Sequence, residues 1–329
     1  MRRLRFSVIL LSAGLLGARD RIATIDFYGY KGVNVDAVAR SLPFHVGDPY
    51  TVNVKSRARE AVFGAIGRPA TDVAAICCNP DGDQHIYIGL PGESSRLFSN
   101  NPEPEGSIRL STELIDLQKR LDAADEAAVH AGDAGEDDSQ GYALSANPAA
   151  RALELKLREY ALQHEKELYS VLESSADAEH RACAANALGY GRQSARQIAA
   201  LVRASRDPSD LVRNNATRAL GCLAEKPEMG KLIPPDTFID MVNSGIWTDR
   251  NKASFVLLAL TAARDPKLLA RLRAQALDAI VEMARWHDSG HAFPGIWIFA
   301  RIAGVPEATA IQAAAGPVEA MLALLPPVH

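Results

Sequence analysis

The sequence predicts a small α+β domain followed by an all-α solenoid of helix pairs, and two observations lead to this prediction. Residues 181–189 (RACAANALG) recur in similar form as residues 213–221 (RNNATRALG), 32 positions later. A repeat of that length is typical of stacked helix pairs, in which each unit buries its apolar face only against its neighbours. Ahead of the repeats, residues 21–92 show strand and helix patterns in the order β-α-α-β-β.

The α+β unit is predicted from short patterned segments between turn residues. Alternating apolar side chains indicate strands, and helices are indicated where a breaker such as Gly67 closes an amphipathic run. The sequence NPDGD between two strand patterns is a strong hairpin signal. The predicted elements are a strand over 23–29, helices over 35–42 and 54–67, and strands over 72–78 and 84–90.

This element order, with GDPY at residues 47–50 between the helices, resembles a POTRA domain. The first strand, IDFYG, and the closing hairpin belong to the same resemblance, which covers residues 19–92. The resemblance implies an exported envelope protein that pairs with other chains by adding an edge strand. Strand pairing with another chain is also expected without the family resemblance, because a three-stranded sheet has open edges that can template another strand.

The N-terminus has the layout of a secretory signal. MRRLR is a basic segment, residues 6–16 are apolar, and small residues follow, so removal of residues 1–18 is predicted. The apolar run is short for a membrane span, although an uncleaved N-terminal anchor stays an alternative. The rest of the chain is expected to be soluble and periplasmic or secreted. Its net charge of −4 argues against nucleic acid as a partner.

Export would place the four cysteines in an oxidising compartment. Cys77 and Cys78 are adjacent in a predicted strand, so a bond between them would require unusual geometry. A disulfide bond between Cys183 and Cys222 stays an alternative. Buried free thiols are the preferred interpretation. An isolated CC pair is also not a zinc pattern, so no metal is predicted there.

Residues 93–146 are expected to connect the two parts. A loop leads to a helix that starts at Ser111 or Thr112, and GDAGEDDSQG (132–141) reads as a flexible acidic linker. Residues 103–139 contain 11 acidic and 3 basic side chains, counted directly from the sequence. Solvation and flexibility are the favoured explanation, and an acidic docking strip is the alternative. A single helix over 148–174, with apolar stripes on opposite sides, is predicted to bridge to the repeats.

The solenoid is predicted over residues 147–325 and resembles HEAT repeats. In that family an Asp and an Arg six positions apart link neighbouring units, and Asp207 and Arg213 match these positions. Ser175 and Ser244 stand where the other acids would be, which predicts an incomplete ladder. The expected helix pairs are 178–190 with 194–205, 209–224 with 235–244, and 249–263 with 267–286, before an irregular cap over 291–325. The structural repeat positions are Arg181, Ala184, Leu188, Gly189, Asp207, Arg213, Ala216, Leu220, Gly221, Arg250 and Ala253.

The resemblance also implies that the second helix of each pair lines a concave face. Arg196 and Arg203 are seven residues apart and would share one side of such a helix. A polar stripe runs along the predicted second helix of the third pair, over 267–286. One interpretation of these residues is a groove that binds carboxylates or phosphates through arginine. The alternative is a solvated face with weak helix ion pairs. The candidate binding residues are Arg196, Arg203, Arg271, Gln275 and Arg285.

The remaining chemical candidates are weak. His287 and His291 lie in HDSGH, but Gly290 indicates a helix end and a third zinc ligand is not evident. His164 lies on an apolar stripe and is expected to be an interior histidine. The sequence lacks nucleophile-elbow, P-loop and dinucleotide motifs, so neither a cofactor nor a catalytic residue is predicted.

The sequence therefore predicts an exported, non-enzymatic interaction scaffold. It would recognise a protein or peptide through the concave helical face, the open sheet edge, or both. The alternative function is an enzyme, or an accessory factor of an enzyme, with the groove as substrate site. Nucleic-acid binding is a third and less favoured reading.

Overall fold

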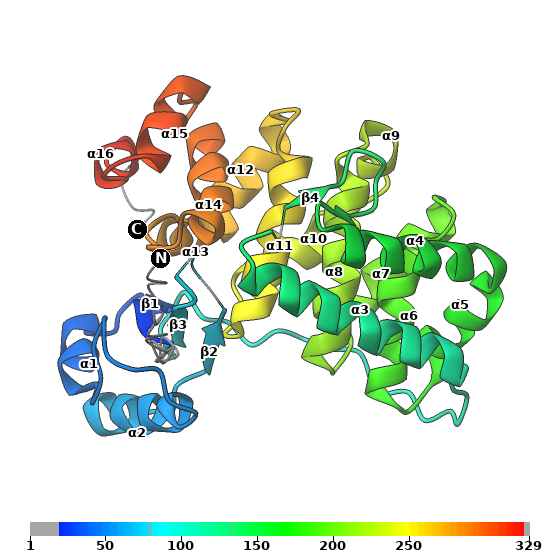
Figure 1. The fold of residues 1–329 in the computed structure, drawn as a ribbon. Helices are drawn as coiled ribbons and strands as arrows, with labels where there is room; N and C mark the ends of the chain where they lie inside the picture. The colour runs from blue at the N-terminus through cyan, green and yellow to red at the C-terminus, as the bar shows by residue number, and fades with distance from the viewer. Residues whose placement is uncertain (1–19, 78, 80, 134, 326–329) are drawn as a thin grey trace, which may run out of the picture.

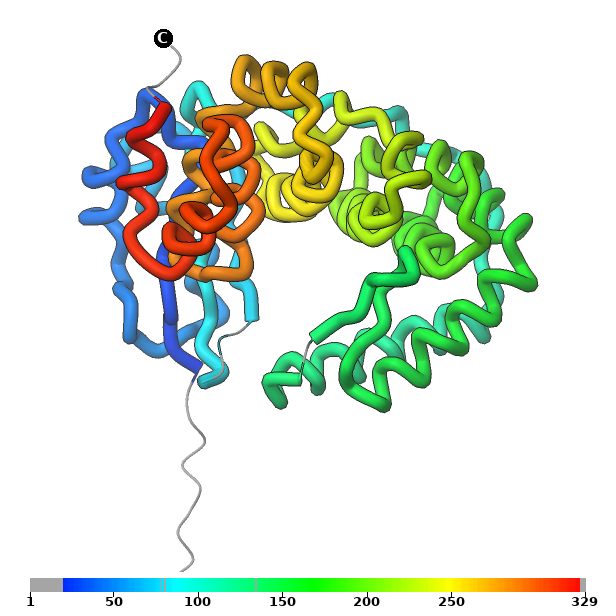
Figure 2. The backbone as a smooth tube through the Cα atoms, turned by 90° about the horizontal axis from the view of Figure 1, so that it is seen from above, coloured from blue at the N-terminus to red at the C-terminus, as the bar shows by residue number. Residues whose placement is uncertain are grey.

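The computed structural model describes residues 20–77, 79, 81–133 and 135–325 of the chain. The predicted secretory signal over residues 1–18 and Cys78 lie outside these residues. A small α+β unit at the N-terminus is followed by a helical solenoid (Figure 1). Seen from above, the solenoid forms an arc whose C-terminal helices lie beside the N-terminal unit (Figure 2). An α+β unit followed by a solenoid was the predicted fold class.

The N-terminal unit has the predicted element order. It consists of β1 (Ile22–Tyr28), α1 (Val35–Ser41), α2 (Val54–Ile66), β2 (Asp72–Ile76) and β3 (Gln84–Gly89). The sheet order is β1-β3-β2, with β3 parallel to β1 and antiparallel to β2. One face of the sheet packs against α1 and α2, where Val38, Val54 and Val62 meet Ile86 and Ile88 in a closed apolar core.

The second face of the sheet is covered by the solenoid. Tyr28 and Tyr87 point to that side and belong to the same apolar core as Trp247 and Trp286. Tyr87 lies between the two tryptophans, with ring centroids 5.0 Å from each. Because both faces are packed, every residue of β3 is buried, as expected for a strand covered on two sides.

The solenoid begins with two helices in place of the single helix predicted over 148–174. The chain leaves helical geometry at His164, where φ is −118° and ψ is 24°. The two helices pack against different neighbours, α4 mainly on α3 and α5 mainly on α6. The second stripe is not covered along α4, where Leu155 and Leu162 are 48% and 38% exposed. His164 stacks on Tyr160 with its side chain 44% exposed, so the expected interior position is wrong.

The repeat units follow the predicted helix pairs closely, and α6, α7 and α12 begin with side-chain caps. Asp177 and Ser194, for example, accept hydrogen bonds from backbone N–H groups of the helices that they start. The second helix of the third pair is broken at Ala276. The helices are α4 (Pro148–Gln163), α5 (Glu165–Ser174), α6 (Ala178–Gly189), α7 (Ala195–Ala204), α8 (Asp210–Ala224), α9 (Pro227–Gly230), α10 (Asp236–Val242), α11 (Trp247–Leu260), α12 (Pro266–Gln275), α13 (Leu277–Ala284), α14 (Ser289–Ile302), α15 (Glu307–Ala314) and α16 (Glu319–Leu322).

The segment before the solenoid begins with a stretch that packs on the repeat units. Residues 93–111, which we call the strap, run in extended form across the ends of three repeat units. Arg96 pairs with Ser244 and Gly106 with Ser175, and the Asn101 amide donates to the Arg206 carbonyl. Successive strap residues therefore contact the units in the reverse of their sequence order, and the strap connects the three units.

After the strap, α3 (Thr112–His130) packs on α4 and α6. The segment expected as a flexible linker forms a short hairpin of β4 (Glu136–Asp137) and β5 (Leu144–Ser145). Glu136 makes an ion pair with Arg218 of α8. This ion pair thus holds the acidic segment against α8.

The first helices of the pairs line the inside of the arc. α8 packs directly on both α6 and α11, and these helices lie on the inner side of the arc in Figure 2, whereas α7, α10 and α12 lie on its outer side. This differs from the family-based expectation that second helices are concave. The repeated small residues give the reason. Alanine and glycine on the first helices let their axes come close, which curves the stack toward that side.

Gly189 and Gly221 occupy equivalent repeat positions but should respond to alanine with opposite signs. A Cβ at residue 189 would lie 2.8 Å from the Cβ of Ala219, so Gly189→Ala should destabilise the protein by about 1–3 kcal/mol through overpacking. At residue 221 the nearest atom is 4.0 Å away. Gly221→Ala should therefore stabilise by about 0.5–1 kcal/mol through helix propensity. Urea denaturation measures both changes, and shifts of equal sign would contradict the close approach.

Candidate functional site

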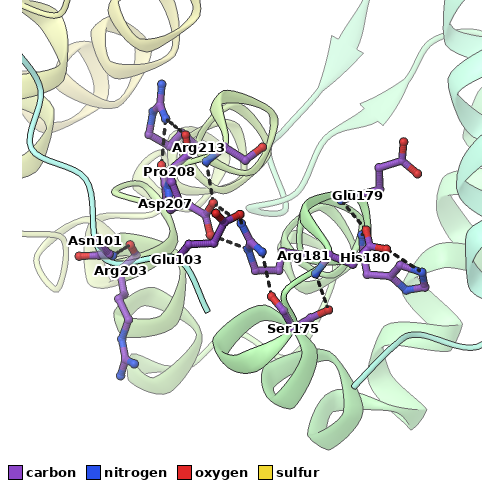
Figure 3. A network of polar contacts seen from close by, with 12 residues as sticks. Asn101, Glu103, Ser175, Glu179, His180, Arg181, Arg203, Asp207, Pro208 and Arg213 are labelled. Atoms are coloured by element: carbon purple, nitrogen blue, oxygen red, sulfur yellow. Dashed lines mark hydrogen bonds and ion pairs between the residues drawn. The ribbon is translucent and has the colours of Figure 1, made fainter. Parts of the chain in front are cut away.

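The predicted ladder links neighbouring units through buried arginines (Figure 3). Arg181 of α6 donates from Nε and Nη2 to the Asp207 carboxylate at 2.8 and 2.9 Å, and from Nη1 to the Ser175 carbonyl. Arg213 of α8 repeats this arrangement with the Asp249 carboxylate and the Asp207 carbonyl. The two arginines therefore occupy equivalent settings, as the repeat requires.

The ladder is complete, which corrects the expectation drawn from Ser175 and Ser244. The acid of the second rung is Asp249, and the Ser244 hydroxyl donates to it at 2.9 Å. The third rung joins Arg250 to Glu282 at 2.8 Å. The long arginine side chain can donate to a carboxylate placed at more than one backbone position, so the sequence spacing of the acids need not be constant.

The strap covers the exposed side of this ladder. Glu103 lies 3.7 Å from Arg181, the Phe98 ring lies 5.9 Å from Arg213, and the Ser94 carbonyl accepts from Arg250. The three ladder arginines are at most 4% exposed. They hold the fold together and present no free charge to a partner.

Glu282 joins the ladder to the N-terminal unit. Its carboxylate, only 2% exposed, accepts from the backbone amides of Gly29 and Tyr30 at 2.7 and 3.0 Å. It also accepts from the Ser94 hydroxyl and from Arg250. One buried carboxylate thus connects the N-terminal α+β unit to the third repeat unit.

The candidate binding residues from the second helices lie outside the arc and do not converge. The Arg196 guanidinium lies 4.0 Å from the Tyr169 ring centre, and the Arg203 carbonyl accepts from the Asn101 side chain. Arg271 pairs with Asp236, and Arg285 pairs with Glu319. The Gln275 carbonyl accepts from the Asn243 side chain. A concave groove must therefore be built from other residues.

A groove of about 420 Å³ opens on the inner side, between α3 and the first helices α6 and α8. We call it the inner groove. Leu211, at 49% exposure, forms part of its apolar wall, and the Asn186 amide donates to Gln118 at 2.8 Å beside the buried Cys183 thiol. Its lining residues are Ile115, Gln118, Lys119, Asp122 and Asp125 from α3, Glu179, Ala182, Cys183 and Asn186 from α6, and Leu211, Asn215 and Arg218 from α8.

The inner groove has an excess of acidic groups. Asp122 accepts a hydrogen bond from the Gln118 amide at 2.7 Å. Among the described residues, Asp122, Asp125 and Glu179 form no ion pair, while Arg218 is paired with Glu136. Burial, together with the nearby Glu154, raises the pKa of Asp125 to about 6. Ionising this carboxyl is therefore costly unless a cation is near.

The HDSGH histidines serve the contact between the sheet and α14. His287 Nδ1 lies 2.7 Å from Asp26, and the Tyr87 hydroxyl lies 2.7 Å from His291 Nδ1. Burial lowers the pKa of His291 to about 4, so the ring stays neutral. In the part of the chain that the structure describes, no three such side chains converge as metal ligands.

The thiols in the solenoid are free. Cys183 and Cys222 form no bridge, and burial raises their pKa values to about 12 and about 11, so both stay protonated. Cys77 is disulfide-bonded, which corrects the expectation of a free thiol at that position.

Comparison with known proteins agrees with this architecture. Residues 165–232, from α5 through α9, match the family model described as HEAT repeats. The fold is that of a helical-repeat protein, and the matched segment is similar to HEAT repeats. No curated protein matches the chain. A membrane span would need a longer and more apolar helix than any that the described residues form.

The solved structures that are similar to the chain include two engineered or designed proteins. One is the crystal structure of an engineered protein of the Northeast Structural Genomics Consortium, 19% identical, with a TM-score of 0.39. The match covers 67% of this chain and 91% of that one. The other is a designed armadillo repeat protein in complex with the peptide (KR)4, 16% identical, with a TM-score of 0.37. It covers 62% of this chain and 88% of that one.

Sequence reasoning did not place α3 in the site. The acidic content of residues 103–139 was the available signal, and the docking-strip alternative came nearest to it. The repeat pattern could not reveal that α3 lies against α6, because α3 has no counterpart in the other units.

Proposed function

We propose that this protein is a non-enzymatic scaffold that binds a segment of a partner protein in the inner groove. The composition of the groove supports this proposal. It combines exposed apolar side chains such as Leu211 with amides and carboxylates on rigid helices. Such mixed surfaces suit the recognition of peptides, in which apolar anchors contribute affinity and polar groups contribute orientation.

The enzymatic alternative has less support from the same groove. Its only thiol, Cys183, is 4% exposed and has a pKa of about 12, so the nucleophilic thiolate would be scarce. Asp125 has a pKa suited to proton transfer, but a nucleophile within reach of it is not evident among the lining residues.

Export and strand pairing belong to the same proposal. Export follows from the signal-like residues 1–18 and would place the groove in the periplasm or outside the cell. The POTRA-like reading of the N-terminal unit adds a second mode of binding. In that mode an outer strand, β1 or β2, would pair with a strand of a partner.

Leu211→Ser should weaken the binding of peptides selected against this protein about fivefold to tenfold, because a half-exposed leucine that is buried on binding contributes about 1–1.5 kcal/mol. Peptides would first be selected from a random displayed library against the full chain. Their affinities would then be measured by fluorescence anisotropy. Leu232→Ser is the matched control, since Leu232 is 48% exposed and lies outside the groove. Equal affinity for both variants would refute the groove as the binding site.

A further inference from the structure

We infer that the occupant of the inner groove is a cationic peptide segment, one that places a lysine or arginine side chain beside an apolar side chain. This inference rests on the proposed function and names the chemistry of the partner. The groove supplies both kinds of contact within one cavity of about 420 Å³.

The cationic side chain of the ligand is inferred from acidic side chains that lack ion-pair partners on both walls of the groove. Asp122 and Asp125 project from α3, and Glu179 belongs to the facing helix α6. No described residue forms an ion pair with any of the three, and Lys119 is the only other unpaired charge among the lining residues. An arginine or lysine between these walls would meet carboxylates from two helices.

The surroundings of Asp125 add to this argument. Acidic groups approach it from three elements, namely Asp122 on its own helix, Glu154 of α4 and Glu136 of β4. Arg218 of α8 is the opposing cation, and its guanidinium is already engaged by Glu136. A further cation would therefore relieve a local excess of negative charge, which an anionic or neutral ligand cannot do.

The apolar part follows from the floor and rim of the groove. Ile115, Ala182 and Leu211 supply aliphatic surface from three different helices. Leu211 is nearly half exposed in the free protein, so covering it removes apolar surface from water. A basic side chain can also lay its methylene stem along this surface with its charged end at the acids.

The experiment uses a fluorescein-labelled hexapeptide of alternating arginine and leucine, titrated against the full chain at about 0.05 M salt. Matched peptides replace each arginine by glutamine or by glutamate. The arginine peptide should bind at least about tenfold more tightly than the glutamine peptide, and the glutamate peptide should bind least. Equal affinity of the three peptides, or no binding up to about 1 mM, would overturn the inference.

Variants locate the effect. Asp122→Asn/Asp125→Asn removes two groove charges and should weaken the arginine peptide about tenfold, with little effect on the glutamine peptide. Asp116→Asn/Glu126→Gln removes two charges from the same helix at exposed positions outside the groove lining. This control should change binding less than about twofold. Equal losses for both pairs would show a general charge effect and refute the assignment.

The pH dependence gives a second readout. A bound cation favours the ionised form of Asp125, so binding lowers its pKa from about 6 and requires release of a proton at lower pH. Affinity for the arginine peptide should therefore fall as pH falls from about 7.5 to about 5, and Asp125→Asn should flatten this profile. A profile unchanged by Asp125→Asn would contradict the assignment of the cation to this carboxyl.

Leu211→Ser separates the two levels of the proposal. If it weakens selected peptides while the charge variants have no effect, the groove binds partners and only the cationic inference fails. If neither Leu211→Ser nor the charge variants alter binding, the groove itself is not the binding site and the proposed function fails.

Discussion

Glu282→Ala should lower the free energy of unfolding by about 3–5 kcal/mol, among the largest effects expected of a single substitution in this chain. The carboxylate is 2% exposed and accepts hydrogen bonds from four groups. These are the amides of Gly29 and Tyr30, the Ser94 hydroxyl and the Arg250 guanidinium. Its removal leaves a fully buried arginine without a carboxylate, together with unpaired buried donors.

Urea denaturation followed by circular dichroism measures this loss. Glu319→Ala is the control, because Glu319 also pairs with an arginine, Arg285, but its side chain is 64% exposed. Solvent screens such a pair, and its loss should cost at most about 1 kcal/mol. Similar costs for the two variants would show that Glu282 does not fasten the N-terminal unit to the solenoid.

Leu220→Ala should lower the free energy of unfolding by about 2–5 kcal/mol. Leu220 is fully buried on α8, which is the first helix of its repeat unit and packs between α6 and α11. The cavity would open where two neighbouring units meet. Because each repeat is stabilised by its neighbours, the loss should affect the cooperative unfolding of the array as a whole.

The control for this prediction lies on the same helix. Leu211→Ala shortens a leucine that is 49% exposed, so its cost should stay below about 1 kcal/mol. Thermal or urea unfolding compares the two variants directly. A midpoint for Leu220→Ala equal to that of the unsubstituted protein would remove this residue from the core.

The strap and the N-terminal sheet change what the repeat array is physically. A plain solenoid has contacts only between adjacent units, and its ends need polar caps. Here the strap joins three units, and the sheet packs against the third unit through Tyr28 and Tyr87. These long-range contacts join residues far apart in sequence, so the array should unfold more cooperatively than repeats alone.

The site illustrates a limit of pattern reasoning. Arg196 and Arg203 were chosen because they share one side of a second helix, and that spacing is real. Which side of the arc a helix faces, however, depends on how closely neighbouring units pack. The close approach of Gly189 to Ala219 brings the first helices together on the inner side of the arc, which leaves second helices such as α7 on the outer side.

The sequence by itself determined the local architecture of this protein. The β-α-α-β-β unit, the helix pairs and the repeat positions from Arg181 to Ala253 follow from spacing over short stretches, where periodicity and turn residues carry the information. Only the tertiary structure decided the rest. The direction of curvature, the acids that complete the ladder, the docking of the sheet and the position of α3 beside the groove depend on contacts between distant residues. Local patterns do not encode such contacts, since each arises from packing summed over many weak interactions.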